Sequence, residues 1–163
     1  MINWLQPNLI FETVRDITPE LLQKHELRSL LLDVDSTLKR YREVVVPAET
    51  VRWIESLKEA GIQLCILSNG RARRIRPIAE QIQVPFVAPA MKPTPFGCRT
   101  AIKTMNFDPK STAIVGDQVF ADILAGKFSK IFTILITPIH PEEEHWYTRI
   151  KRPFEKWFVK RVN

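Results

Sequence analysis

Asp33 and Asp35 stand at the end of a strongly apolar segment. The preceding residues 29–32, Ser-Leu-Leu-Leu, are typical of a buried strand. Because side chains alternate in direction along a strand, residues two apart point to the same side. We therefore expect the two carboxylates to converge at the carboxyl end of the strand, where ligands bind in open α/β sheets. Two carboxylates there suit either a divalent cation with oxygen ligands or a nucleophile with an acid/base partner.

Further polar residues stand just beyond three later apolar segments. They are Ser68 and Asn69 after the second segment, Lys92 after the third, and Asp117 with the nearby Asp122 after the fourth. Each of them alone is typical of an ordinary turn or surface position. Parallel strands, however, bring their carboxyl ends to one edge of a sheet, so we expect the whole set to meet there.

The elements that would position these residues alternate along the chain. Helices are predicted for residues 18–25, 47–60, 71–82, 94–105 and 121–128, and strands for residues 29–32, 62–67, 86–88, 112–115 and 131–136. Continuously apolar strands separated by helices indicate a parallel sheet that is covered on both faces. We predict one α/β domain over residues 1–163, with a five-stranded parallel sheet.

Composition narrows the class of protein and of partner. The chain is 45% hydrophobic and 26% charged, as expected of a globular protein with a real core. Its net charge of +6 favours anionic partners, namely phosphorylated metabolites, acidic lipid headgroups or nucleic acid. Cys65 and Cys98 form no CxxC pair, which excludes a zinc ribbon and a redox motif. We find no signal-peptide pattern and no membrane-spanning run, and expect a cytoplasmic protein.

The segment from Asp33 to Thr37, together with Ser68, Lys92 and the segment from Gly116 to Asp122, resembles the four motifs of the haloacid dehalogenase phosphatase superfamily, in order. The likeness spans residues 30–126. Ser36 replaces the asparagine often found at its position in the first motif. The chain is most similar to the small subfamily IIIA and to its branch that includes phosphatidylglycerophosphate phosphatases. This resemblance implies a three-layer Rossmann-like fold without a cap domain.

The resemblance also implies roles for the acidic residues. Asp33 would attack phosphorus to form an aspartyl-phosphate, and Asp35 would be the acid/base partner. We expect the neighbouring carboxylate of Asp33 to raise the pKa of Asp35 and so help it to keep a proton. Mg²⁺ would be held by Asp33, by Asp117 and by the main-chain carbonyl of Asp35, with Asp122 as a further ligand or an orienting group.

The remaining motif residues are expected to hold the phosphate. Ser68 and the amide of Asn69 would lie at a helix N-terminus and bind phosphate oxygens, and Lys92 would neutralise charge on the transferring group. The intervals 36–67 and 69–91 are too short to contain a cap domain. We therefore expect a site that is open to bulky, surface-presented or macromolecular substrates.

Basic residues are concentrated near the predicted site. Four arginines follow Ser68 and Asn69 at the start of a helix, where the helix dipole disfavours cations: Arg71, Arg73, Arg74 and Arg76. They indicate either an anionic substrate or membrane beside the site, or a solvated face that tolerates a small penalty. Both interpretations remain open at this point.

The segment 141–163 is basic and amphipathic. Trp146, Ile150, Phe154 and Trp157 recur at helical spacing, with basic residues offset from them. Pro153 is expected to kink this helix or to divide it in two. The pattern is typical of a helix on a membrane surface. It is equally typical of an apolar stripe that packs on the domain core.

Three functions are compatible with these observations. The first is a Mg²⁺-dependent phosphatase that acts on the phospholipid phosphatidylglycerophosphate, as a peripheral protein on an anionic membrane. The second keeps the chemistry and changes the substrate to a soluble sugar or nucleotide phosphate. The third is a non-enzymatic protein that binds nucleic acid or a ribosome-associated partner. The acidic set argues against the third, because concentrated negative charge does not help to bind an anion.

Overall fold

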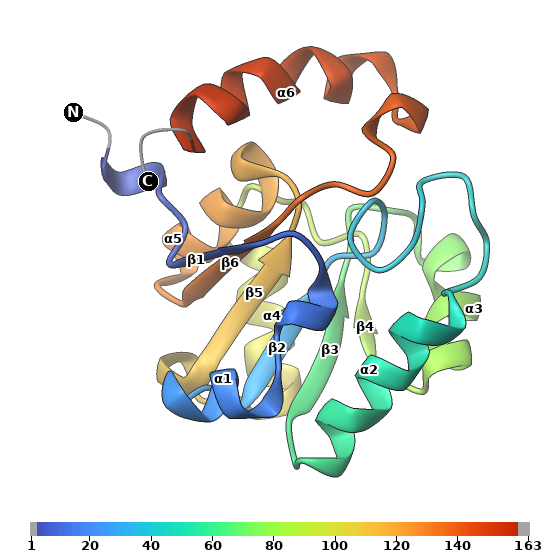
Figure 1. Ribbon diagram of the computed structural model, residues 1–163. Coiled ribbons are helices and arrows are strands. Elements are labelled where there is room, and N and C mark those ends of the chain that lie inside the picture. Colours follow the sequence, from blue (N-terminus) through green and yellow to red (C-terminus); the bar gives the residue numbers. More distant parts are fainter. Residues whose placement is uncertain (1–2, 160–163) are drawn as a thin grey trace.

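The structure of the protein, a computed structural model, describes residues 3–159 and is built around one parallel sheet (Figure 1). The six strands lie in the order β1-β6-β5-β2-β3-β4, and every recorded pair is parallel. Their bounds are β1 (Leu9–Phe11), β2 (Ser29–Leu32), β3 (Gln63–Leu67), β4 (Phe86–Val87), β5 (Thr112–Gly116) and β6 (Phe132–Ile136). The predicted parallel α/β sheet is confirmed.

The predicted number of five strands is wrong, because β1 adds a sixth at the edge. Leu9 of β1 pairs with Ile134 of β6. The side chain of Asn8 fixes this register, since its Oδ1 accepts a hydrogen bond of 2.9 Å from the main-chain N–H of Thr133. A three-residue strand is too short to show a periodic pattern, and its place depends on an edge that only the folded sheet provides.

The helices follow the predicted order, and their bounds are α1 (Pro19–Lys24), α2 (Ala48–Glu59), α3 (Ala72–Ile82), α4 (Phe96–Met105), α5 (Leu124–Ser129) and α6 (Trp146–Val159). A π-helical turn, η4 (Val119–Ile123), precedes α5. Thr18 caps α1 as expected, because its side chain accepts a hydrogen bond of 3.2 Å from the main-chain N–H of Leu21.

Two apolar layers enclose the sheet because its strands are apolar on both faces. Leu30 and Leu32 of β2 belong to the larger cluster, which includes residues of α1, α2 and α3. Leu31, between them, points to the opposite face and joins residues of α4 and α5. This alternation along one strand explains why the sequence shows a continuous apolar run rather than an amphipathic one.

The helix α6 lies across the carboxyl edge of the sheet (Figure 1). It continues through Pro153, so the prediction that this proline divides the segment is wrong. Near its end, Val159 packs on the small buried cluster of Val119, Ile123 and Leu135, as does Leu5 from the other end of the chain. Residues 160–163 of the predicted basic segment lie outside the described residues.

No helix within residues 3–159 combines the length and the apolar character that crossing a membrane requires.

Candidate active site

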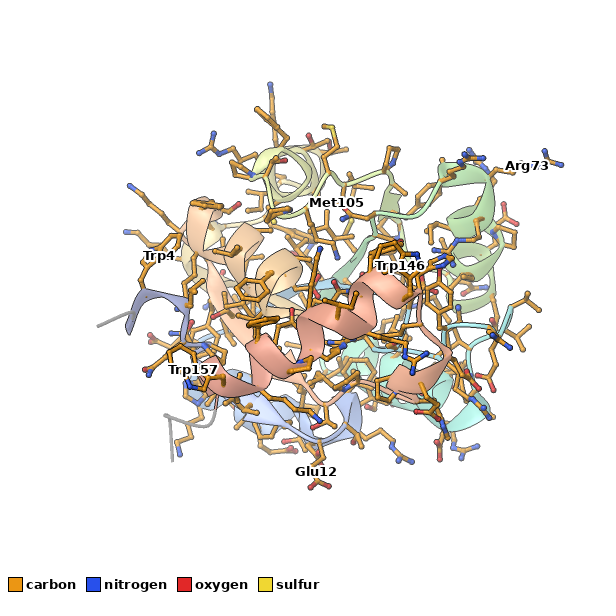
Figure 2. The ribbon with its side chains drawn as sticks, turned by 90° about the horizontal axis from the view of Figure 1, so that it is seen from above. Trp4, Glu12, Arg73, Met105, Trp146 and Trp157 are labelled. Carbon is orange, nitrogen blue, oxygen red and sulfur yellow. The ribbon has the colours of Figure 1, made fainter. Side chains whose placement is uncertain are left out.

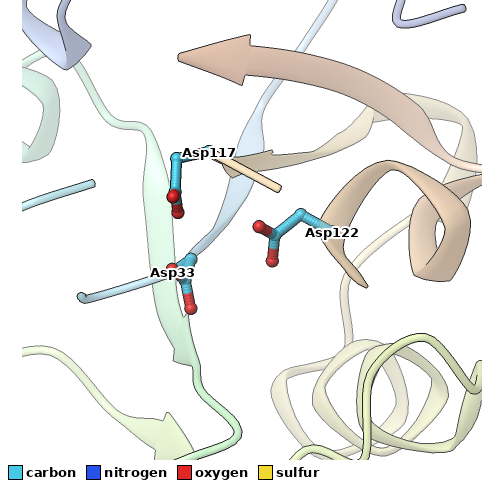
Figure 3. Close-up of side chains that lie close together, drawn as sticks. All are labelled: Asp33, Asp117 and Asp122. Atoms are coloured by element: carbon cyan, nitrogen blue, oxygen red, sulfur yellow. The ribbon is translucent and has the colours of Figure 1, made fainter. Parts of the chain in front are cut away.

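Three carboxylates meet at the carboxyl edge of the sheet (Figure 3). Asp33 follows β2, Asp117 follows β5, and Asp122 lies in η4. One carboxylate oxygen from each lies within 4.8 Å of the others, and the residues are only 8%, 3% and 1% exposed, respectively. The first two meet because β2 and β5 are paired neighbours. The main-chain N–H of Asp33 extends this pairing with a hydrogen bond of 2.9 Å to the carbonyl of Val115.

Asp122 reaches the cluster because Gly116 leaves room for it. A Cβ atom at Gly116 would overlap the carboxyl group of Asp122. The main-chain N–H of Gln118 then orients that carboxylate with a hydrogen bond of 3.0 Å to Oδ2. The position is therefore restricted to glycine by the close approach of a functional side chain.

Lys92 supplies a cation inside the cluster. Its Nζ donates hydrogen bonds to Asp33 Oδ1 at 2.8 Å, to Asp122 Oδ1 at 2.6 Å and to the Leu67 carbonyl at 2.8 Å. Burial alone would lower the pKa of Lys92, but the carboxylates of Asp122 and Asp33 raise it above its ordinary value. The side chain is therefore a cation at neutral pH, in contact with the predicted nucleophile.

Asn69 holds the segment that carries Lys92. Its Oδ1 accepts a hydrogen bond of 2.7 Å from the main-chain N–H of Lys92, and its Nδ2 donates one of 2.9 Å to the carbonyl of the same residue. The side chain of Asn69 thus joins the turns after β3 and β4. Ser68 lies beside it, buried, and its Oγ accepts a hydrogen bond of 3.1 Å from the N–H of Gly70.

Asp35 is turned toward a different pair of cations. Its Oδ1 accepts hydrogen bonds of 2.9 Å from both Lys39 Nζ and Arg74 Nη1. Burial would raise the pKa of Asp35, but the hydrogen bonds and positive charges of Arg74 and Lys39 outweigh it and hold the pKa below its ordinary value. The expectation that Asp33 raises the pKa of Asp35 is therefore wrong. The alternation of side chains along a strand predicts which way Asp35 points, but it does not reveal that Lys39 and Arg74 contact this carboxylate.

Arg152 is a site residue that the sequence shows only as one of the basic residues offset from the apolar positions of the segment 141–163. It is only 8% exposed, and its guanidinium contacts the carboxylates of Asp117, Glu144 and Glu155. Its Nη1 also donates a hydrogen bond of 2.6 Å to the main-chain carbonyl of Asp117. A signal was present in the sequence, since Glu155 is the single acid after residue 144 and stands three positions from Arg152 on the same helical face.

Only one of the four predicted arginines reaches the site. Arg74 lines the cavity beside Asp35. Arg76 lies over the ring of Phe86, with 5.5 Å between the guanidinium carbon and the ring centroid. Arg71 and Arg73 are exposed, and Arg73 points away from the molecule (Figure 2). The structure therefore places Arg74 in the cavity wall and the other three arginines outside it.

A cavity of about 270 Å³ opens beside the carboxylates. Its wall combines the predicted motif residues Asp33, Asp35, Ser68, Lys92 and Asp122 with Tyr41, Arg74, Gln118, Tyr147, Thr148 and Lys151. Ser36 also lines it, and within residues 3–159 its buried hydroxyl finds no hydrogen-bond partner. The last three wall residues belong to α6, so the C-terminal helix forms one side of the cavity.

The donor set fits a hard divalent cation. The ion pairs of the site join six carboxylates to four cations, which leaves two negative charges over: Asp33, Asp35, Asp117, Asp122, Glu144 and Glu155 against Lys39, Arg74, Lys92 and Arg152. Burial raises the pKa of Asp33 to about 6, against the lowering effect of Lys92. Oxygen ligands with uncompensated negative charge are what Mg²⁺ prefers.

The fold and this site define the class of the protein. The sequence profile of the haloacid dehalogenase-like hydrolase family matches residues 2–129, and the chain belongs to this family. The probable phosphatase YqeG of Bacillus subtilis (strain 168) is 29% identical over 150 residues, which cover 92% of this chain and 87% of that protein. The prediction that the chain is a hydrolase of this family is thus confirmed, and its similarity to a probable phosphatase supports phosphatase activity.

Solved structures share the fold at low sequence identity. A hypothetical protein, XCC2798 from Xanthomonas campestris, has a TM-score of 0.60 at 11% identity, over 93% of this chain and 79% of that one. The 3-deoxy-D-manno-octulosonate 8-phosphate phosphatase of Moraxella catarrhalis, solved with magnesium, phosphate and KDO, has a TM-score of 0.50 at 16% identity. That match covers 62% of this chain and 64% of the phosphatase, less than two thirds of its length. At these identities the likeness concerns the fold.

Proposed function

We propose that the protein is a Mg²⁺-dependent phosphomonoester phosphatase with Asp33 as nucleophile, and that its substrate is phosphatidylglycerophosphate. The observation that carries the chemistry is the contact of Lys92 with both Asp33 and Asp122 beside Asp117. A buried carboxylate cluster with an internal cation suits the transfer of a phosphoryl group better than the binding of an anion alone.

In the first step, a carboxylate oxygen of Asp33 forms a bond to phosphorus as the bond from phosphorus to the substrate alcohol breaks. The departing oxygen takes a proton, for which the protonated form of Asp35 is the proposed donor. A substrate phosphate that draws Arg74 away from Asp35 would remove one of the two cations that hold the pKa of this carboxyl low. In the second step, water forms the new bond to phosphorus, the bond to Asp33 breaks, and Asp35 accepts the proton of the water. Inorganic phosphate leaves, and Asp33 is regenerated.

The other residues act on charge and orientation. Lys92 neutralises charge on the transferring group. Ser68, the main-chain amide of Asn69 and the hydroxyl of Ser36 are proposed to hold phosphate oxygens, because all three residues line the cavity and the Ser36 hydroxyl has no hydrogen-bond partner within residues 3–159. Mg²⁺, bound by Asp33, Asp117 and Asp122, with the proposed help of the Asp35 carbonyl, would supply further positive charge for the phosphoryl oxygens.

The size of the cavity supports a substrate that enters only in part. A volume of about 270 Å³ lies just below the range of roughly 300–1,000 Å³ that is usual for small-molecule sites. A phosphate with a glycerol unit fits such a space, whereas two acyl chains have to remain outside it. The soluble alternative, a sugar phosphate, draws support from the phosphatase of Moraxella catarrhalis, whose fold is shared.

The test compares phosphate release from phosphatidylglycerophosphate in mixed micelles with release from a panel of sugar and nucleotide phosphates, with Mg²⁺ or with EDTA. We expect the lipid to be the best substrate and EDTA to abolish its hydrolysis. Hydrolysis of a soluble phosphate that is faster by orders of magnitude would overturn the lipid substrate and leave the chemistry in place. Absence of hydrolysis for every compound would overturn both.

A further inference from the structure

The outer face of α6 carries large apolar side chains that the domain does not cover. Trp146 is 71% exposed, Ile150 57% and Phe154 62%, and these residues follow one another at intervals of four. At 3.6 residues per turn they form a single stripe along the helix. Of the two interpretations that the sequence left open for this stripe, packing on the domain core does not agree with these exposed fractions.

The inner face of the same helix is ionic. Arg152 and Glu155 are buried there, and they bind the turn after β5 through the Asp117 carbonyl and the N–H of Phe120. A water-soluble helix normally buries its apolar face and exposes its polar face. In α6 this order is reversed, which indicates that the apolar face has a partner outside the domain.

The charges that border the stripe are all positive. Arg149 and Lys156 flank it on one side and Lys151 on the other, and all three are exposed. Glu155 is the one acid of α6, and it points inward to Arg152. The exposed surface of the helix therefore combines tryptophan and aliphatic groups with cations, which complements an acidic lipid surface rather than a neutral protein groove.

The stripe lies next to the mouth of the active-site cavity. Tyr147, Thr148 and Lys151 of α6 form one wall of the cavity, while Trp146 stands beside them at the start of the helix. Figure 2 looks onto this side of the molecule and shows Trp146 and Trp157 along the helix. A surface bound to the outer face of α6 would therefore lie close to the place where substrate enters.

We propose that the outer face of α6 docks on the surface of an anionic membrane, with Trp146, Ile150 and Phe154 inserted at the headgroup level and Arg149, Lys151 and Lys156 in contact with acidic lipids. This inference rests on the proposed function for the lipid nature of the substrate. It explains how a cavity too small for acyl chains can receive a phosphate from a lipid that stays in the bilayer.

Sedimentation of the full chain with vesicles tests the proposal. We expect binding to mixed phosphatidylglycerol and phosphatidylcholine vesicles, and weak binding to phosphatidylcholine alone. Trp146→Ser with Ile150→Ser and Phe154→Ser should reduce binding by roughly tenfold or more. Arg149→Gln with Lys156→Gln should reduce it by a similar factor. The matched control is Lys103→Gln with Lys110→Gln, which removes two exposed charges near the opposite edge and should leave binding unchanged.

Three further results separate this proposal from others. Asp33→Asn should bind vesicles like the unaltered protein, because docking does not need turnover. Failure to bind anionic vesicles, with hydrolysis of the lipid in micelles retained, would overturn docking alone; binding without lipid hydrolysis would support docking and overturn the proposed substrate. A dimer in sedimentation velocity that the apolar triple substitution dissociates, with no vesicle binding, would show that a second copy covers this face instead.

Discussion

Asp117 connects the proposed chemistry to the C-terminal helix. Thr37 Oγ1 donates a hydrogen bond of 2.9 Å to its Oδ1 and also lies 3.4 Å from Asp33 Oδ2, so one hydroxyl bridges both carboxylates. Arg152 contacts the other oxygen of Asp117. Burial raises the pKa of Asp117 well above its usual range, against the lowering effect of Arg152. The charge of Arg152 therefore offsets only part of the effect of burial, and a bound cation would further favour the ionised form of Asp117.

Asp33→Asn removes the proposed nucleophile while it keeps the size of the side chain. We expect the rate of phosphate release from an aryl phosphate to fall by roughly 10⁴-fold or more, because an amide oxygen does not form the covalent intermediate. Glu59→Gln, at the exposed end of α2, is the matched control and should keep full activity. A rate near that of the unaltered protein for Asp33→Asn would contradict the mechanism.

Arg152→Leu leaves three carboxylates without their shared cation. Removing one partner of a buried ion pair typically costs about 3–5 kcal/mol, and we expect a loss of unfolding free energy in that range. Arg152→Lys should restore part of it, since it keeps the charge and loses the planar fork. Urea denaturation at neutral pH measures both variants. Equal stability of Arg152→Leu and the unaltered protein would show that Arg152 does not fasten α6.

At the scale of elements, the start of α4 supports the segment that carries Lys92. Gly97 in its first turn lies against Ala90, and a Cβ atom there would overlap the Ala90 carbonyl. The packing of Gly97 against Ala90 restrains residues 90–92, and the hydrogen bond from the main-chain N–H of Lys92 to Asn69 restrains the same segment. The position of the Lys92 ammonium group therefore depends on helix packing as well as on its own ion pairs.

Gly97→Ala should push this segment away from α4. We expect a loss of about 1–3 kcal/mol in unfolding free energy, as for other overpacked sites. The catalytic rate should fall as well, because Lys92 is displaced from Asp33. Thr100→Ala, exposed on the same helix, serves as the control and should change neither quantity. Unchanged stability and rate in Gly97→Ala would show that the helix does not position Lys92.

At the scale of the whole molecule, positive charge lies outside and negative charge inside. The chain carries +6 overall, and the ion-paired cluster of the site carries two negative charges, so the remainder carries +8. A basic exterior attracts anionic substrates and surfaces. The excess of negative charge in the buried cluster favours the binding of a divalent cation. Binding of that ion should stabilise the folded state.

Mg²⁺ should therefore raise the melting temperature of the protein. Saturation at 100 times the dissociation constant contributes about 2.7 kcal/mol to stability. The measurement is thermal unfolding in MgCl₂ against NaCl of equal ionic strength. Asp117→Asn should abolish most of the shift, because it replaces one of the three anionic ligands by a neutral amide. An equal shift in both proteins would place the ion elsewhere.

Much of the fold could be predicted from the sequence. The strands of a buried parallel sheet are apolar on both faces, and their carboxyl ends lie at one edge of the sheet. The same reasoning predicts that Asp33, Asp117 and Asp122 lie together, as they do at the carboxyl edge of the sheet. It could not find β1, which is too short to show a pattern. It also missed the burial of Arg152, because the sequence left open which face of α6 points inward. The partners of Asp35 come from a loop and another helix, whose approach no local spacing shows.

The small cluster of Val119, Ile123 and Leu135 has a consequence for the site. Leu5 and Val159, which are 154 positions apart in the sequence, both pack on it. Two of its members belong to the turn that carries Asp122. The orientation of a proposed metal ligand is thus braced by two segments that are far apart in the sequence. A smaller side chain at Leu5 or at Val159 would therefore be felt at the phosphate-binding centre, although neither residue lines the cavity.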